Sequence, residues 1–316
     1  MPGIRIPKNY HIYLSVAIVV LLLGIPLNWF MTEEASSADI TVLQIENAPE
    51  NIVFIADPHI RKENYNETMQ VIEDINALNP SLVLLGGDFI FGDGNDLYLQ
   101  EVWSSLSAPA YAVLGNHDYH AGITQSTLLS KIIRGMTVDV RPENYDVSNL
   151  YDDTTDFAFA DNLTRVLLRN NVTVLKNEYK SLQVNGTNLT LVGIDDGMAG
   201  LAHPPTVTDN GAYTIYLIHE PDLRSEWGAD LVLSGHTHGG QFFPKNSSIL
   251  GLVLSGLVSD TNQWTYVSRG IGTSNLNHEI RLFSTPEIVV INPSVRPEEI
   301  FPDKKVQYFQ VPSKKR

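Results

Sequence analysis

Short apolar runs alternate with longer amphipathic stretches through the first half of the chain. Residues 52–56, 82–85 and 110–114 carry no charged side chain, which is typical of strands buried on both faces of a sheet. Residues 64–78 and 97–106 lie between these runs and have apolar side chains at helical spacing. The resulting β-α-β-α-β order predicts parallel strands joined by right-handed crossovers.

The second half of the chain is richer in predicted strands. One helix is predicted over 158–169, and strands are predicted over 172–175, 179–184, 189–194, 213–218, 231–233, 264–268 and 288–291. The acidic stretch 136–157 interrupts the alternation and predicts a surface insertion, with a substrate lid as the alternative. Residues 296–316 predict a basic, poorly ordered C-terminal tail.

The N-terminal segment has a different pattern. No Lys, Arg, Asp or Glu occurs between Lys8 and Glu33, and residues 12–30 are mainly apolar, about the length that crosses a hydrocarbon core of about 30 Å. We expect a cytoplasmic stub and a transmembrane anchor in residues 1–31, then a linker and first strand in residues 32–49. The basic residues before the segment and the acidic ones after it predict a single-pass protein of the cell membrane with its catalytic domain on the extracytoplasmic side.

A cleaved signal peptide, which would leave a secreted protein, is one alternative to an anchor, and a buried core helix is the other. Ser36-Ser37-Ala38 offers the small residues that a signal peptidase requires, although they lie several residues beyond the apolar run. Export is also compatible with Asn-x-Ser/Thr sequences at Asn66, Asn162, Asn171, Asn185, Asn188 and Asn246.

Composition narrows the functional classes. The net charge of −15 argues against nucleic-acid binding, because that function needs a basic surface to displace the counterions of phosphate. The chain has no cysteine, which excludes disulfides, thiolate zinc sites and a cysteine nucleophile. Roughly 280 residues follow the apolar segment, enough for one large domain, which we expect over residues 50–295.

Polar islands follow five of the predicted strands. Because ligands collect at the carboxyl ends of strands in α/β sheets, we expect these islands to meet at one rim. Each residue alone is more often a cap, a turn or a semi-buried histidine, whereas carboxylates, imidazoles and an amide oxygen together are donors for divalent metals. Asp195-Asp196 also follow a strand, but Gly197 after them predicts a plain turn. The islands are Asp57-Pro-His59, Asp88, Asn116-His117-Asp118, His219 and His236-Thr-His238.

Together these islands resemble the calcineurin-like metallophosphoesterase superfamily, and the similarity covers nearly all of residues 50–292. Residues 231–241, 266–273 and 281–283 are similar to one branch, the membrane-associated phosphodiesterases that resemble UDP-2,3-diacylglucosamine diphosphatase. The resemblance implies an α/β fold, a four-layer α-β-β-α sandwich of two mixed sheets, which the N-terminal transmembrane helix would precede.

The resemblance also implies a pair of divalent metal ions bridged by Asp88. It assigns one metal to Asp57, His59, Asp88 and His238, and the other to Asp88, Asn116, His219 and His236. His117 would face the substrate, with Asp118 as its orienting partner. The mixed oxygen and nitrogen donors suit Mn²⁺, Fe or Zn²⁺. Phe91 occupies the position where purple acid phosphatases have a tyrosine ligand, so a tyrosinate centre is not expected.

The expected activity is metal-dependent hydrolysis of phosphodiester or pyrophosphate bonds by attack of a metal-bridging hydroxide. The N-terminal segment and the branch resemblance motivate a lipid-linked or cell-envelope substrate. A phosphomonoesterase is one alternative, and cationic side chains near the motifs, which a monoester usually recruits, are few: Arg61, Lys62 and Arg269. A catalytically silent binding protein on the same fold is the other alternative.

Overall fold

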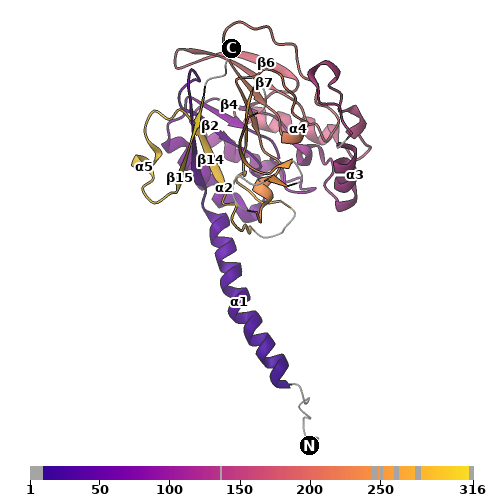
Figure 1. Ribbon diagram of the computed structural model, residues 1–316, viewed down its shortest axis with the longest axis vertical. Helices are drawn as coiled ribbons and strands as arrows, with labels where there is room; N and C mark the ends of the chain where they lie inside the picture. Colours follow the sequence, from indigo (N-terminus) through magenta and orange to yellow (C-terminus); the bar gives the residue numbers. More distant parts are fainter. Residues whose placement is uncertain are drawn as a thin grey trace, which may run out of the picture.

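The computed structural model of the protein describes residues 10–135, 137–243, 248–249, 252–259, 263–274 and 279–312. Two mixed β-sheets form its centre, and helices flank them (Figure 1). The strands of the first sheet are β1 (Asp39–Ile45), β2 (Ile52–Ile55), β3 (Leu82–Leu85), β4 (Ala110–Ala112), β5 (Val172–Val174), β14 (Glu287–Ile291) and β15 (Val306–Val311). Those of the second are β6 (Glu178–Val184), β7 (Thr187–Gly193), β8 (Tyr213–Leu217), β9 (Leu231–Ser234), β12 (Gly256–Ser259) and β13 (Trp264–Val267).

Pairing within the sheets confirms the predicted parallel unit. The first sheet has the order β15-β1-β14-β2-β3-β4-β5, in which β2 to β5 run parallel and β14 is antiparallel to β2. The second has the order β12-β13-β9-β8-β7-β6, with β7, β8, β9 and β13 parallel. A small hairpin pairs β10 (Ser248–Ile249) with β11 (Leu252–Val253). The helices are α1 (Tyr10–Ser36), α2 (Tyr65–Ala77), α3 (Gln125–Gly135), α4 (Phe157–Arg169) and α5 (Pro297–Ile300).

Burial on both faces explains why the strands read as continuous apolar runs. One face of the first sheet packs against Ile72 and Ile75 of α2 and Leu163 of α4. Its other face meets the second sheet, where Phe54 and Leu191 belong to one buried cluster. Residues 97–106, predicted as an α-helix, form a 3₁₀ helix (Leu97–Ser105) beside α2 and α4.

Part of the predicted insertion packs against the second sheet. Within residues 137–156, Val147 and Leu150 are buried against Val192 and Tyr216 on the outer face of the second sheet. Short 3₁₀ helices and loops, rather than long helices, therefore form much of this outer layer. The prediction of a surface insertion is confirmed for most of residues 137–157, whose side chains are exposed or half-buried, but it did not anticipate that Val147 and Leu150 are buried.

Regular secondary structure occurs at both ends of the chain where a linker and a poorly ordered tail were predicted. The predicted polar linker is helical, because α1 continues to Ser36. The predicted poorly ordered tail contains α5 and β15, and β15 pairs in parallel with β1 at the edge of the first sheet. Only residues 313–316 of that tail lie outside the described residues. The first strand expected within residues 32–49 is β1, and with β15 the first sheet spans residues 39–311.

Helix α1 projects from the body of the molecule (Figure 1), and many of its apolar side chains are exposed. Leu22, Leu23 and Trp29 are each more than 60% exposed. Within the described residues, however, no helix has both the length and the apolarity that crossing a membrane requires. The structure therefore gives no support to the predicted transmembrane helix over residues 1–31, of which residues 1–9 lie outside the described part.

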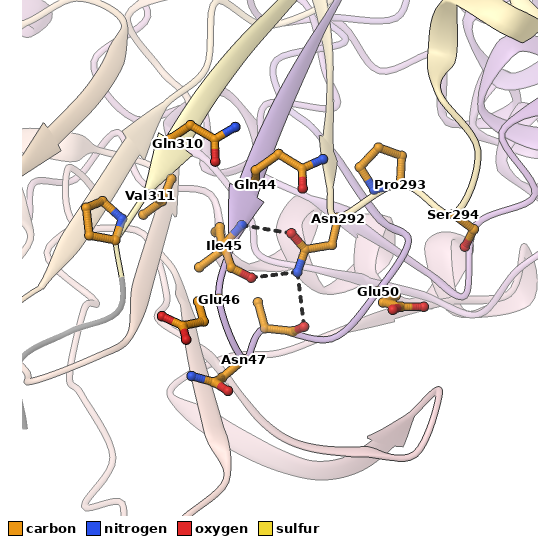
Figure 2. A pocket seen from close by; sticks show the side chains of 12 residues that line it. Gln44, Ile45, Glu46, Asn47, Glu50, Asn292, Pro293, Ser294, Gln310 and Val311 are labelled. Atoms are coloured by element: carbon orange, nitrogen blue, oxygen red, sulfur yellow. Dashed lines mark hydrogen bonds between the residues drawn. The ribbon is translucent and has the colours of Figure 1, made fainter.

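A polar pocket of about 700 Å³ lies at the carboxyl ends of β1, β14 and β15 (Figure 2). The side chain of Asn292 forms part of the pocket wall and is fixed by hydrogen bonds. The Asn292 side-chain oxygen accepts from the Ile45 amide, and its nitrogen donates to the carbonyls of Ile45 and Ala48. Since β14 is antiparallel to β2, this pocket is at the opposite edge of the sheet from the predicted metal ligands.

Candidate metal centre

The predicted ligands meet where the carboxyl ends of the two sheets' parallel strands face each other. Asp57 and His59 follow β2, Asp88 follows β3, and Asn116 begins a 3₁₀ helix (Asn116–Tyr119) after β4. From the second sheet, His219 follows β8, and His236 and His238 follow β9. All seven proposed ligands lie in this region, and six of them are buried while His236 is half-buried.

One group of ligands consists of Asp57, His59 and His238. Their donor atoms lie within 4.8 Å of one another. The Nε2 atoms of His59 and His238 are 3.0 Å apart, and His238 Nε2 is 3.8 Å from Asp57 Oδ1. This group combines residues from both sheets.

A second group consists of Asp88, His219 and His236, whose donor atoms also lie within 4.8 Å of one another. His219 Nε2 is 3.1 Å from Asp88 Oδ2 and 3.3 Å from His236 Nδ1. The same Asp88 oxygen is 3.4 Å from His59 Nε2 in the first group. The Asp88 carboxylate therefore lies between the two groups, as a bridging ligand must.

Backbone carbonyls fix the orientation of three imidazoles. The Nδ1 atoms of His59, His219 and His238 lie 2.8, 2.7 and 3.1 Å from the carbonyl oxygens of Ile90, Gly86 and Gly272. With Nδ1–H donating to a carbonyl, the lone pair of Nε2 faces the other ligands, which is the usual support for metal-binding histidines.

The ligands are held in strained backbone conformations. Asp57, His59, Asp88, His236 and His238 all have positive φ, between 40° and 71°. Such conformations cost about 1–3 kcal/mol each for non-glycine residues and persist only where surrounding structure enforces them. Their concentration here indicates that geometry at this site outweighs local conformational preference.

Burial also shapes the electrostatics of the site. It raises the pKa of Asp57 to about 7 and lowers the pKa of His59 to about 3. Burial alone would lower the pKa of His219, but the carboxylates of Asp88 and Asp57 raise it well above its ordinary value. A divalent cation binds deprotonated imidazoles and carboxylates, so it would displace the proton of His219, and its charge would offset the desolvation of the acids.

Two buried oxygen atoms support this fit. Among the described residues, Asp57 Oδ2 and Asn116 Oδ1 are buried side-chain atoms without a hydrogen-bond partner. The amide nitrogen of Asn116 donates to the Ala121 carbonyl at 2.8 Å, which fixes the side chain and leaves its oxygen available. Unsatisfied buried oxygens cost free energy unless a cation or donor occupies the site. The residues present therefore fit a pair of divalent metals.

The two predicted catalytic residues have different surroundings. The His117 ring packs edge-on against His59 at 4.7 Å, and His59, Asp88 and His117 form a further group with ligand spacing. The carboxylate of Asp118 accepts from the Gly115 and Ile90 amides, so it braces the loops after β3 and β4 rather than the imidazole of His117. Burial raises the pKa of Asp118 to about 8.

One residue beside the site, Arg281, was not predicted from the sequence to support it. Arg281 is fully buried and donates to the carbonyls of Gly270 and Gly272, close to His238. The only available signal was the similarity of residues 281–283 to one enzyme branch. The turn predicted after Asp195-Asp196 lies at residues 197–200, and the two carboxylates before it are buried, with Asp195 accepting from the Tyr119 hydroxyl at 2.7 Å.

Comparison with known proteins identifies the family. The model of the calcineurin-like phosphoesterase family matches residues 50–240. Phosphodiesterase YaeI of Escherichia coli (strain K12) is 27% identical over 266 residues, covering 77% of this chain and 82% of that protein. UDP-2,3-diacylglucosamine pyrophosphatase LpxG of Chlamydia muridarum is 27% identical over 282 residues, covering 76% and 82%. Phosphopantetheinyl hydrolase of Mycobacterium tuberculosis aligns with a TM-score of 0.40 and 12% identity, covering 74% of this chain and 96% of that one. The family match and the site together show that this chain belongs to the calcineurin-like phosphoesterases and is a metallophosphoesterase.

Proposed function

We propose that this protein hydrolyses phosphodiester or pyrophosphate bonds at a dinuclear metal centre. The position of Asp88 carries the proposal, because one carboxylate oxygen lies 3.4 Å from His59 and 3.1 Å from His219, in the two ligand groups. Two divalent ions bound there would supply hydroxide near neutral pH and neutralise the phosphoryl oxygens. Convergence of six of the seven proposed ligands into groups with metal-ligand spacing argues against a catalytically silent binding protein.

Side chains beside the centre favour a diester over a monoester. The Arg61 guanidinium lies 4.1 Å above the Phe91 ring and is paired with Glu279 at 2.6 Å. Arg269 is fully buried and paired with Glu287 at 2.9 Å. Arg61 and Arg269 are therefore committed to neighbours, and the exposed Lys62 lies 3.7 Å from Asp96, while a monoester dianion usually recruits Arg or Lys for its extra charge.

His117 is suited to act on the substrate. Burial lowers its pKa, so the imidazole is neutral at pH 7. Its amide donates to Asp88 Oδ1 at 2.9 Å, which fixes the residue beside the bridging carboxylate. From this position the neutral ring can donate an N–H hydrogen bond to a transferring phosphoryl group.

The experiment that tests this proposal is hydrolysis of bis-p-nitrophenyl phosphate by EDTA-stripped protein with Mn²⁺, Fe²⁺ or Zn²⁺ added back. The wild type should turn over only with metal, and Asp88→Asn should lose activity by at least about a hundredfold because the bridging charge is removed. p-Nitrophenyl phosphate is the matched monoester. Faster turnover of the monoester would refute the diester preference, and full activity of Asp88→Asn would refute the dinuclear centre.

We further propose a lipid-linked or envelope substrate and an extracytoplasmic position for the domain. The name of the LpxG relative and the exposed apolar side chains of α1 support the first; the charges flanking residues 12–30 support the second. Cleavage of bis-aryl phosphate without cleavage of any nucleotide-linked lipid or phospholipid would refute the lipid substrate. Survival of the domain when protease is added to intact cells would refute the extracytoplasmic position, and its release into the medium would indicate signal cleavage.

A further inference from the structure

The C-terminal end of helix α1 is hydrogen-bonded to a segment that contacts the proposed metal ligand His238. The Glu34 carboxylate accepts from the Phe283 amide at 2.9 Å and from the Thr285 hydroxyl at 3.1 Å. One turn earlier, the Met31 carbonyl accepts from the Arg281 amide at 3.0 Å. These bonds attach α1 to residues 281–285, which are about 250 residues further along the chain.

The same segment holds the loop of His238. The Ser284 hydroxyl donates to the His238 carbonyl at 2.9 Å, and the Leu282 amide donates to the Gln241 carbonyl at 2.9 Å. His238 has φ of 51°, so its backbone needs outside support to keep this conformation. Residues 281–285 therefore fix the main chain of a proposed metal ligand.

The segment also fixes the imidazole of that ligand. Arg281 donates to the carbonyls of Arg269 at 2.7 Å and Ser284 at 2.9 Å, and its second terminal nitrogen donates to the Gly272 carbonyl. Gly272 is the partner of His238 Nδ1. Arg281 is fully buried, so its position depends on the chain that carries it. Support for a metal-binding imidazole of this kind typically changes metal affinity or activity by about 10–100-fold.

We propose that Glu34 is a positioning residue for the metal ligand His238. The carboxylate of Glu34 holds residues 281–285 against the body of the protein, and Arg281 and Ser284 transmit that position to the ring and backbone of His238. The inference rests on the proposed dinuclear centre and adds that α1 is part of its support. It predicts an effect on the metal bound by Asp57, His59 and His238 and little effect on the metal bound by Asn116, His219 and His236.

Calorimetric titration of the EDTA-stripped full chain with Mn²⁺, in mild detergent, tests this proposal. Glu34→Ala should weaken one of the two Mn²⁺ sites by about tenfold and leave the other within about twofold. Saturating Mn²⁺ should restore the kcat for bis-p-nitrophenyl phosphate, because the variant changes occupancy rather than chemistry. Glu34→Gln, which keeps one carbonyl acceptor, should fall between the wild type and Glu34→Ala.

Glu33→Ala is the matched control, since Glu33 is an exposed carboxylate on the same turn of α1 and should leave both sites unchanged. Equal Mn²⁺ affinities in Glu34→Ala and Glu33→Ala would overturn the proposal. An equal loss at both sites, together with a lower melting temperature of the metal-free protein, would also overturn it because that result indicates general destabilisation.

A second variant tests the same proposal if Glu34→Ala does not fold. Thr285→Val removes only the hydroxyl that donates to Glu34, and it should weaken the same single site by about two- to threefold. Unchanged affinity in this variant would overturn the proposal. If the wild type binds two Mn²⁺ but hydrolyses no phosphoester, the proposed activity fails while the comparison of affinities still decides the role of Glu34.

Discussion

Gly87 allows the loops after β3 and β4 to approach each other at the metal centre. A Cβ atom at this position would lie 2.7 Å from the Gly115 nitrogen, 2.9 Å from the Leu114 carbonyl carbon and 2.8 Å from His219 Nδ1. Two of these atoms belong to the backbone and cannot rotate away. Gly87 also has φ of 91°, a conformation that side chains of L-residues disfavour.

The cost of Gly87→Ala follows from these two effects. The positive φ should cost about 1–2 kcal/mol and the crowding about 1–3 kcal/mol, so the free energy of unfolding should fall by about 2–5 kcal/mol. Relief of the clash would displace the ring of His219, whose Nδ1 is 2.7 Å from the Gly86 carbonyl. A shift of about 1 Å at a reacting centre lowers turnover by about a hundredfold.

Gly186 offers a matched control for this prediction. Its φ is 82°, close to that of Gly87, but a Cβ atom there would have no neighbour within 4 Å. Gly186→Ala should therefore cost only the conformational part, about 1–2 kcal/mol, and keep full activity. Urea unfolding and Mn²⁺-dependent hydrolysis of bis-p-nitrophenyl phosphate measure both quantities. If the two variants lose equal stability and equal activity, crowding at Gly87 does not determine the geometry of the site.

Two further predictions concern the pH dependence of Mn²⁺ affinity and the stability contributed by a buried lysine, Lys131. Burial raises the pKa of Asp57 to about 7 and lowers that of His59 to about 3, so in the group of Asp57, His59 and His238 the carboxylate is the ligand that exchanges a proton for metal below pH 7. Mn²⁺ affinity from calorimetry should therefore fall by about tenfold per pH unit below 7, and a flat profile would contradict this. Lys131 is buried with its Nζ 2.9 Å from Asp152, which is partly exposed, so Lys131→Met should lower the free energy of unfolding in urea by about 2–3 kcal/mol. Arg134→Met, at a more exposed partner of the same carboxylate, should cost less than about 1 kcal/mol, and equal losses would contradict the pairing.

The buried strands and the metal ligands could be predicted because both depend on short-range sequence patterns. A strand such as β2 is buried on both faces, so it appears as an unbroken apolar run. Asp57 and His219 follow directly after such runs, and Asp88 follows one after two glycines, where the ends of parallel strands must meet. The fold dictates this placement, and no distant contact is needed to recognise it.

Elements that depend on distant partners could not be predicted in the same way. Strand β15 is half exposed at the edge of the first sheet, and Lys304 and Lys305 before it favoured a tail. Its pairing with β1 involves residues more than 260 positions away. The contact between Glu34 and Phe283 is of the same kind, since nothing local to either residue indicates the other. Positive φ at Asp57 or His238 is likewise imposed by tertiary structure against local preference.

The distribution of the proposed ligands over the two sheets makes the core between them part of the support of the candidate metal centre. Asp57 and His59 come from the first sheet and His238 from the second, while Asp88 faces His219 across the same boundary. Each proposed metal therefore depends on the distance between the sheets, which the buried side chains packed between them set. A close-packed core resists small displacements, so it can hold several strained ligands at the spacing that two ions require. For this reason, side chains that never contact the substrate determine whether Asp88 can bridge.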